Sequence, residues 1–557
     1  MKHALSAGGL SALAALATTW PWPLHPARAP GARDLEAGDH LWALWLGSKD
    51  GMLTAKTARI GAPEGYTWVV GDPAHVPVFA FGDAVAGAGL GLGLVQLLAL
   101  GLAAVAAWAW ARECWPDRPS VAVLAPPLAV ASPGLGLGLV TGMTEAQPLG
   151  LTALALLALL RAARLGTPGA TAVCALAFGA LPWFGPYPAL YGVLLAPFAL
   201  LGGLLPPGSR ARLTRVGAVV AAATAALVLA APVLVSVLSA RAPTLPGGTA
   251  ITARVLSDPE LPLNRMLGAD LLGLFLPGLE AAPTGVHGAY LGTGAVAAAA
   301  MAVGRRSHRR WVPVTLVAAC VVLALGFTLQ AGGSVLRVGG APLLAPAGAL
   351  SLMLEELGRA PRWTRMATLG SILLAPVAAA GLESLSRRVP SRAAPLLLGC
   401  GLAALVADAI ALGPAPFPRP TFAAAPPSEF DALDTAGSVL ELPAPRYSTA
   451  LPETGGGARA RLRHPTLVWQ TGHGRSLSGN PHQAGLAEGR GAHTGQRVLD
   501  AAVAGDAAAL EAARATALEQ GFVWAVAYRG LIEDRQHTAL EEAWGPPVVE
   551  GPALSAW

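Results

Sequence analysis

Long apolar runs alternate with short polar connections over the first three quarters of the chain. A run of about 20 apolar residues is what an α-helix needs to cross the roughly 30 Å of hydrocarbon in a bilayer. The pattern therefore predicts a mainly α fold, a polytopic transmembrane helical bundle with about 11 spans. The predicted spans lie near residues 4–20, 85–110, 120–140, 147–160, 169–184, 187–205, 216–239, 289–303, 311–330, 366–385 and 394–413.

The composition excludes a water-soluble globular protein. The mean hydropathy is +0.52 and only 13% of the 557 residues are charged, whereas about a quarter are charged in a typical soluble domain. The net charge of +5 comes mostly from arginines in the loops, so it reports orientation in the membrane and predicts no nucleic-acid partner. The four cysteines lie far apart in the sequence and match neither a disulfide framework nor a metal-ligand spacing.

Arginine clusters occur in every second connection, and the connections between them are nearly free of basic residues. This is the charge bias of membrane proteins whose basic loops face the cytoplasm. The alanine-, glycine- and arginine-rich composition indicates a bacterial genome. We therefore predict a multi-pass protein of the bacterial inner (cytoplasmic) membrane, with its amino terminus inside. The basic connections contain Arg112 and Arg118, Arg161 and Arg164, Arg210, Arg212 and Arg215, Arg305, Arg306, Arg309 and Arg310, and Arg387, Arg388 and Arg392.

The first apolar run has two interpretations. It follows Lys2 and His3, as the apolar part of a cleaved signal peptide would. The sequence Trp-Pro-Trp-Pro that follows is no small-x-small cleavage site, which favours an uncleaved first span. Either interpretation places residues 21–84 outside the cytoplasm.

The charge pattern places three segments on the outer face: a first loop at 21–84, a second loop at 240–288, and a tail at 415–557. We expect residues 1–414 to form the membrane domain and the tail to form a small extracytoplasmic α/β domain after a proline-rich linker. The tail is predicted to contain strands at 438–442, 466–470 and 522–528 and a helix at 496–519.

Residues 341–357 are apolar but hold Pro342 and Pro346 and end in Glu355 and Glu356. A full span here would move the tail into the cytoplasm and turn the 387–392 arginines outward. A re-entrant or interfacial segment keeps every charge assignment consistent, and we predict one.

The first outer loop contains the leading candidate for chemistry. Asp39 is expected at the N-cap of a helix whose Trp42 and Trp45 lie on the membrane surface, with His40 beside it. That geometry holds a carboxylate at the boundary between water and lipid, where a base is needed for a reaction of a lipid-borne donor. The alternative is that Asp39 only caps the helix, a contribution of about 1 kcal/mol.

Other acidic residues are weaker candidates for substrate binding. Glu64 and Asp72 occur in turns of the first outer loop, and Glu145 lies in a short outer turn. Asp270 precedes an apolar stretch, and a carboxylate close to hydrocarbon usually faces a polar cavity. Each has the alternative of an ordinary interfacial or solvated acid, and His75 is expected to be a surface residue.

One arginine cluster falls on the outer side, against the charge bias. Arg359, Arg362 and Arg365 stand immediately before a span, with Trp363 as the expected interfacial anchor. The planar guanidinium presents a fork of donors that matches phosphate oxygens. The cluster therefore predicts a site for a lipid-linked phosphate, and the alternative is that these side chains reach to lipid headgroups.

Several short motifs, taken in order, resemble bacterial GT-C-type membrane glycosyltransferases and their YfhO-like relatives, which use polyprenyl-phosphate sugars. The motifs are Gly38-Asp39-x-Leu41-Trp42-x-x-Trp45, Ala62-Pro63-Glu64-Gly65, Ala269-Asp270-Leu271-Leu272, Arg359-x-Pro361-Arg362-x-x-Arg365, Val439-Leu440-Glu441-Leu442-Pro443 and His473-Gly-Arg475-x-Leu477-x-Gly479. The resemblance implies an outward-facing cavity, a polyprenyl-phosphate sugar donor, and Asp39 as the catalytic acidic residue. The chain departs from the pattern at His40 and Ala62. It also shows no obvious second acidic pair for a metal, so a divalent cation such as Mg²⁺ or Mn²⁺ stays open as a cofactor.

We therefore predict an inverting, hexosyltransferase-type membrane enzyme. It would move a sugar from a lipid-linked donor to a glycan, lipid or protein acceptor on the extracytoplasmic face. Two alternatives remain: a transporter or flippase of a lipid-linked saccharide, and a non-catalytic membrane assembly protein. Predicted mid-span positions are almost wholly apolar, which disfavours the transporter.

Overall fold

A computed structural model of the chain describes residues 2–32, 36–57, 59–63, 65–69, 71–204, 209–239, 268–277, 289–302, 308–354, 362–433, 437–443, 463–478, 490–529 and 531–557. Helices occupy every position at which a span was predicted. The third predicted span is two helices, because Ser132 and Pro133 interrupt it. The bundle helices are α1 (Lys2–Thr19), α4 (Ala88–Cys114), α5 (Pro119–Val130), α6 (Pro133–Thr141), α7 (Leu149–Leu165), α8 (Pro168–Phe184), α9 (Pro186–Leu204), α10 (Ser209–Ser239), α13 (Thr293–Ala302), α14 (His308–Ala324), α17 (Arg365–Ser386) and α18 (Ala394–Ala411).

Within the described part of the chain, 6 helical segments are long and apolar enough to cross a membrane, judged by length and composition. These segments establish a multi-pass membrane protein, and the count of eleven spans stays a prediction. They are Ala88–Cys114, Pro119–Thr141, Pro186–Leu204, Leu213–Ser236, Arg365–Ser386 and Ala394–Ala411.

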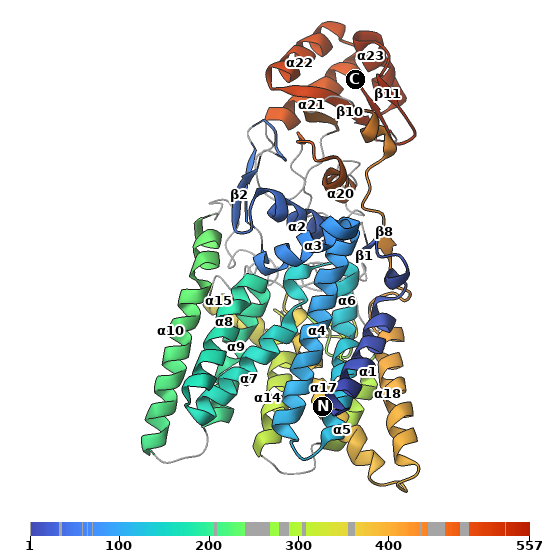
Figure 1. Cartoon of the computed structure of the whole chain (residues 1–557). Coiled ribbons are helices and arrows are strands. Elements are labelled where there is room, and N and C mark those ends of the chain that lie inside the picture. The colour runs from blue at the N-terminus through green and yellow to red at the C-terminus, as the bar shows by residue number, and fades with distance from the viewer. Residues whose placement is uncertain are drawn as a thin grey trace.

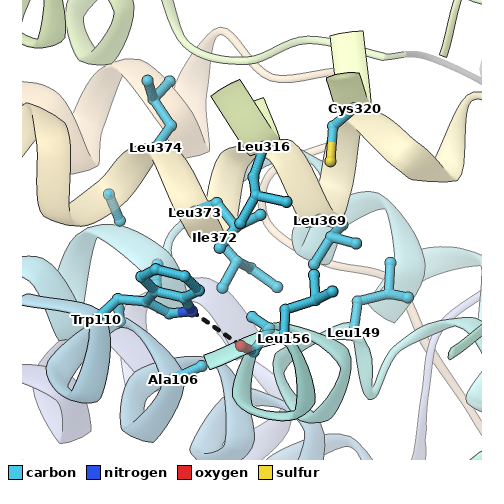
Figure 2. Close-up of a cluster of buried hydrophobic side chains, with 14 of the residues drawn as sticks. Ala106, Trp110, Leu149, Leu156, Leu316, Cys320, Leu369, Ile372, Leu373 and Leu374 are labelled. Carbon is cyan, nitrogen blue, oxygen red and sulfur yellow. Dashed lines mark hydrogen bonds between the residues drawn. The ribbon is translucent and has the colours of Figure 1, made fainter. Parts of the chain in front are cut away.

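Helix α17 lies at the centre of the bundle and packs against α4, α5, α7, α13 and α14. Its apolar side chains interleave with those of its neighbours, as Figure 2 shows for Leu369, Ile372 and Leu373. The indole nitrogen of Trp110 donates to the carbonyl of Ala153 at 2.9 Å, so this buried donor is paired. Helix α18 is mostly exposed, as expected for a helix that faces lipid.

The bundle has two distinct ends (Figure 1). The connections α4–α5 and α17–α18, both arginine-bearing, lie at one end, which we call the basic end. Glutamate side chains form ion pairs with arginines at this end. Glu383 accepts from Arg118 Nη1 at 2.9 Å and from Arg387 Nε at 2.5 Å, and Glu113 accepts from Arg161 and Arg164 at 2.8 and 2.9 Å.

The tail lies at the opposite end, which we call the outer end (Figure 1). Its four-stranded sheet has the order β11-β12-β10-β9, in which β9 and β10 are parallel and the other neighbours antiparallel. Helix α21 packs on β9 and α22 packs on β10. The elements are β9 (Ser438–Leu442), α20 (Arg463–His473), α21 (Arg490–Ala504), α22 (Ala507–Glu519), β10 (Phe522–Tyr528), α23 (Asp534–Trp544), β11 (Val549–Glu550) and β12 (Leu554–Ala556).

Two of the three strands predicted for the tail are confirmed, with the predicted bounds 438–442 and 522–528. The strand at 466–470 is wrong, because these residues lie in α20. The helix at 496–519 is two helices. Gly505 adopts φ +67° between them, and the Asp506 carboxylate accepts from the backbone N–H of Ala509 at 2.9 Å to begin α22.

Short hairpins and one short helix occupy residues 330–353. The hairpins pair β4 (Gln330–Ala331) with β5 (Ser334–Val335) and β6 (Arg337–Val338) with β7 (Ala341–Pro342). Helix α15 (Pro346–Met353) has 8 residues, about 12 Å of helix at 1.5 Å per residue. It is too short to cross a bilayer, so no full span forms within residues 341–354, and a re-entrant or interfacial position of 341–357 stays a prediction.

The first outer loop connects the bundle to the tail. It contains η1 (Trp22–Leu24), β1 (Ala29–Pro30), α2 (Gly38–Asp50), β2 (Thr54–Thr57), β3 (Tyr66–Val69), η3 (Pro73–His75) and α3 (Val76–Ala86). In Figure 1, α2 and α3 lie between the bundle below and the tail helix α20 above. Strand β1 pairs with β8 (Thr421–Phe422), which ties the linker before the tail to the same loop.

Candidate functional site

Helix α2 carries the leading candidate, Asp39. The helix begins at Gly38, and its N-cap residue is Ala37. The expectation that Asp39 is the N-cap is therefore wrong: Asp39 lies inside the first turn, and its side chain is buried. Asp39 therefore lies near the positive end of the dipole of α2.

The apolar face of α2 does not lie on the membrane surface, contrary to prediction. Trp42 and Trp45 are both buried, and α2 packs against α3 and against α20 of the tail. The indole nitrogen of Trp42 donates to Gln470 Oε1 at 2.6 Å. The same amide donates through Nε2 to the carbonyls of Arg59, at 2.5 Å, and Arg475, at 2.7 Å. One buried side chain of the tail thus holds the helix that carries Asp39.

The turn between α6 and α7 approaches the start of α2 closely. Gly142 has φ +70°, and a Cβ there would lie 2.3 Å from Ala37 Cα, so only glycine fits. Two residues further on, Thr144 Oγ1 lies 3.1 Å from His40 Nδ1. This turn, which includes η4 (Thr144–Ala146), therefore fixes both the backbone and one side chain beside Asp39.

The outward arginines reach the same place from the start of α17. Arg362 makes a two-pronged pair with Glu36, three residues before Asp39: Nη1 lies 2.9 Å from Oε2, and Nη2 bonds Oε1. The Tyr191 hydroxyl donates to the backbone carbonyl of Arg362 at 2.7 Å. Residues three apart near a helix start lie on neighbouring positions of one face, so Asp39 stands about one turn from the carboxylate that holds Arg362.

Arg365 is less completely paired. Its guanidinium lies 4.0 Å above the ring of Tyr187, and its Nη1 is 3.9 Å from Glu145 Oε1. That Nη1 is buried and has no hydrogen-bond partner. The sulfur of Met143 contacts both Arg362 and Arg365, and sulfur is a weak acceptor. We call Glu36, Met143, Glu145, Tyr187, Arg362 and Arg365 the arginine site.

A buried Asp–His pair adjoins the arginine site. Asp72 Oδ2 lies 2.9 Å from His75 Nδ1, and both side chains are buried, so the expectation of a surface histidine is wrong. His75 packs edge-on against Phe184, and its Nε2 has no hydrogen-bond partner. A Cβ on Gly71, next to Asp72, would lie 2.9 Å from Glu145 Oε2, so the pair borders the acidic side of the site.

Asp270 has a different environment. Its carboxylate accepts backbone N–H bonds from four residues, at 2.7–3.1 Å: Leu272, Gly273, Gly332 and Gly333. Such a set of donors satisfies both oxygens. Asp270 therefore clamps two backbone segments together, which accounts for its burial without a substrate. Glu64 and Arg359 lie outside the described residues.

The sequence predictions omitted several residues of the site. Glu36 was passed over although its spacing of three from Asp39 places both on one helix face. Tyr187 and Tyr191 gave only the weak signal of a Pro-Tyr-Pro turn before a span. Trp363, expected as an interfacial anchor, is fully buried in the core. Within the described ranges, no three His, Cys, Asp or Glu side chains are grouped as a metal ion requires.

Comparison with known proteins gives structural matches only. No protein-family model matches the chain, and no curated protein sequence is similar to it. The chain is similar to an oligosaccharyltransferase of Archaeoglobus fulgidus, at 13% identity and TM-score 0.43, covering 96% of this chain and 70% of that one. It is also similar to the arabinofuranosyltransferase AftD of Mycobacteria, at 16% identity and TM-score 0.46, covering 99% and 41%.

A third similar structure is ArnT of Cupriavidus metallidurans bound to undecaprenyl phosphate. The identity is 12% and the TM-score 0.38, and the match covers 99% of this chain and 97% of that one.

Proposed function

We propose that this protein is an integral membrane glycosyltransferase that moves a sugar from a polyprenyl-phosphate donor to an acceptor on the extracytoplasmic face. The observation that supports it is the meeting of two parts of the chain far apart in sequence. The Glu36–Arg362 pair joins the turn just before α2, the helix of Asp39, to the residues just before α17, which begins at Arg365. A base and a phosphate-binding group must lie this close to serve one small reacting centre.

In the proposed reaction, Asp39 takes the proton of an acceptor hydroxyl as its oxygen attacks the anomeric carbon of the sugar. The new bond forms on the face opposite the phosphate, so the anomeric centre inverts. The bond from the anomeric carbon to the phosphate oxygen breaks, and its electron pair stays on the phosphate. General-base assistance of this kind is typically worth about 10²–10⁴-fold.

The arginines would hold the departing phosphate. Arg362 offers a planar fork of donors, and Arg365 has a buried Nη1 without a hydrogen-bond partner. A donor in that position gains a strong charge-assisted bond when a phosphate oxygen reaches it. It also offsets the charge that grows on the leaving group. In this proposal Arg359 is a third member of the phosphate site.

The proposed sidedness follows from the two ends of the bundle. Arginine-bearing connections lie at the basic end, and the site lies at the end that adjoins the tail (Figure 1). If the basic end faces the cytoplasm, then Asp39, the arginine site and the tail are all extracytoplasmic. A glycan, lipid or protein acceptor would then reach Asp39 from outside.

The deciding experiment replaces Asp39 by Asn in purified protein supplied with polyprenyl-phosphate sugars. We expect sugar transfer to fall by at least about 100-fold because the base is lost, while the melting temperature stays within a few degrees. Asp83→Asn is the matched control, because Asp83 pairs with Lys49 at 3.6 Å on the surface of the same region. Full transfer by the Asp39→Asn variant would remove the base assignment.

The same preparation, reconstituted in vesicles, separates the transporter alternative. An enzyme should form a product in which the sugar is bonded to the acceptor. A flippase should move the intact lipid-linked saccharide across the bilayer without forming that product. Translocation without transfer by the wild-type protein would replace the proposal.

A further inference from the structure

The Glu36–Arg362 pair occupies the donor positions that a phosphate would need. Both carboxylate oxygens of Glu36 face both terminal nitrogens of Arg362, which is the geometry in which a guanidinium binds two phosphate oxygens. The side chains of Arg362 and Glu36 are 23% and 27% exposed. The pair is therefore open enough to exchange partners, unlike a fully buried ion pair.

We propose that Glu36 is an exchangeable counter-ion of Arg362, which holds the guanidinium in the empty site and is displaced by the phosphate of the lipid donor. This inference rests on the proposed function, because it requires a phosphate ligand at Arg362. It assigns to Glu36 a positioning role that neither the base Asp39 nor the arginines supply.

A counter-ion is useful here because Arg362 is largely buried. A charge that is partly removed from water without a partner is costly, and the guanidinium would turn away from the site. Glu36 keeps the fork facing the start of α2, where the phosphate must bind. The Tyr191 hydroxyl fixes the backbone carbonyl of the same residue at 2.7 Å, so the arginine is held at both its main chain and its side chain.

Arg365 favours the replacement of Glu36 by phosphate. When phosphate replaces Glu36, Arg362 loses one charge-assisted pair and gains another of the same kind. Phosphate also offers oxygens to Arg365, whose Nη1 has no hydrogen-bond partner and lies 3.9 Å from Glu145 Oε1. After transfer, the return of Glu36 to Arg362 competes with the phosphate product and favours its release.

The test measures binding of farnesyl phosphate, a short polyprenyl monophosphate, to the full-length protein in detergent by titration calorimetry. We expect Glu36→Gln to bind it about tenfold more tightly, because the competing charge is gone and the amide remains as a side chain of equal size. Arg362→Gln should bind it at least about tenfold more weakly. Glu113→Gln is the matched control, since Glu113 also binds arginines, but at the basic end, and its affinity should not change.

The double variant Glu36→Gln/Arg362→Gln shows whether the effect acts through Arg362. Displacement predicts that Glu36→Gln has no effect once Arg362 is absent, whereas a general loss of negative charge would still tighten binding. Tightening retained in the double variant, or unchanged or weaker binding by Glu36→Gln alone, would overturn the counter-ion role while leaving the phosphate site intact. Unchanged binding by Arg362→Gln would instead overturn the phosphate site.

If Glu36→Gln does not fold, Glu36→Asp gives the same answer. Its carboxylate is one methylene shorter and cannot keep both contacts to Arg362. We expect it to bind farnesyl phosphate more tightly than the wild type, though less tightly than the amide would. Weaker binding by Glu36→Asp would contradict the inference.

Discussion

At the basic end of the bundle Glu383 and Glu113 each bind two arginines, whereas at the outer end Arg362 pairs with Glu36 and Arg365 approaches Glu145. Glu383 and Glu113 each accept from a pair of guanidinium groups. Arg362 pairs with Glu36, and Arg365 stands 3.9 Å from Glu145 with a buried nitrogen that has no hydrogen-bond partner. Arginine and glutamate thus form structural ion pairs at the basic end. At the outer end they form a site in which one donor, Arg365 Nη1, has no hydrogen-bond partner.

The difference lies in what surrounds each pair. Glu383 is 6% exposed and lies within α17, between the arginines that begin α5 and end α17. Glu36 lies in the single helical turn just before α2 and is half-buried. A buried carboxylate that joins two helices contributes stability, and a partly solvated carboxylate can leave its partner at smaller cost.

The largest effect should come from breaking the ion pairs of Glu383. Glu383→Gln leaves the Arg118 guanidinium, only 10% exposed, without its carboxylate, and we expect a loss of about 3 kcal/mol in the free energy of unfolding. Glu36→Gln should lose less than about 1 kcal/mol, because its pair is partly solvated. Unfolding in mixed micelles containing dodecyl sulfate measures both, and equal losses would contradict the contrast between the two ends.

A second comparison exchanges arginine for lysine. Arg365→Lys keeps the charge but loses the planar fork and the stacking on Tyr187, so farnesyl phosphate should bind about tenfold more weakly, about 1.4 kcal/mol. Arg387→Lys at the basic end changes a side chain that is 53% exposed, and neither binding nor melting temperature should change. Titration calorimetry with both variants tests this, and full affinity in Arg365→Lys would exclude Arg365 from the phosphate site.

The tail differs from both ends of the bundle, because burial there favours the neutral form of a titratable side chain, His473. His473 stacks on Phe430, with ring centroids 4.3 Å apart, and its Nδ1 accepts from the backbone N–H of Arg475 at 3.1 Å. Burial, with a contribution from the Arg475 charge, lowers the pKa of His473 to about 3. In the unfolded chain the imidazole has a pKa near 6.5.

Between these two pKa values the unfolded chain binds more protons than the folded one, so stability rises with pH and is lost as pH falls below about 6.5. We expect the free energy of unfolding to drop by about 1 kcal/mol from pH 7 to pH 5, discounted because the ring is partly exposed. His473→Gln should remove this slope. A slope that persists in the variant would assign the pH dependence to another group.

The smallest expected effect is that of salt, which should screen charge interactions at the arginine site more than those of the buried pair at the basic end. Raising NaCl from about 0.1 M to about 1 M shortens the screening length from about 10 Å to about 3 Å. Farnesyl phosphate should bind several-fold more weakly at the arginine site, which solvent reaches. The buried pair of Arg118 and Glu383 should keep its contribution to stability, so the loss caused by Glu383→Gln should be the same at both salt concentrations.

The arrangement of the bundle could be predicted because it depends on local patterns. Apolar length located each helix, and arginine placement separated the two ends before any contact was known. The exceptional position of Arg362 and Arg365 was visible for the same reason. Strands 438–442 and 522–528 were also found from their short β-branched and aromatic runs.

The errors occur where contacts between distant residues decide the structure. Residues 466–470 have a strand-like composition but form part of α20, because the helix docks on α2 through Gln470 and Trp42. Trp42 and Trp45 look like membrane anchors until the tail that covers them is known. Glu36 becomes significant only when Arg362, 326 residues away, lies beside it, and no spacing rule in one sequence reveals that partner.

The hydrogen bond from Trp42 to Gln470 joins residues 428 positions apart, and this separation has a consequence for biosynthesis. Translation at about 5–20 residues per second implies a wait on the order of tens of seconds between the emergence of α2 and that of α20. During this interval Trp42 and Trp45 are not yet covered by α20. We expect them to contact the bilayer or a chaperone until α20 has been made. The contact between α2 and α20 therefore forms only after α20 has left the ribosome.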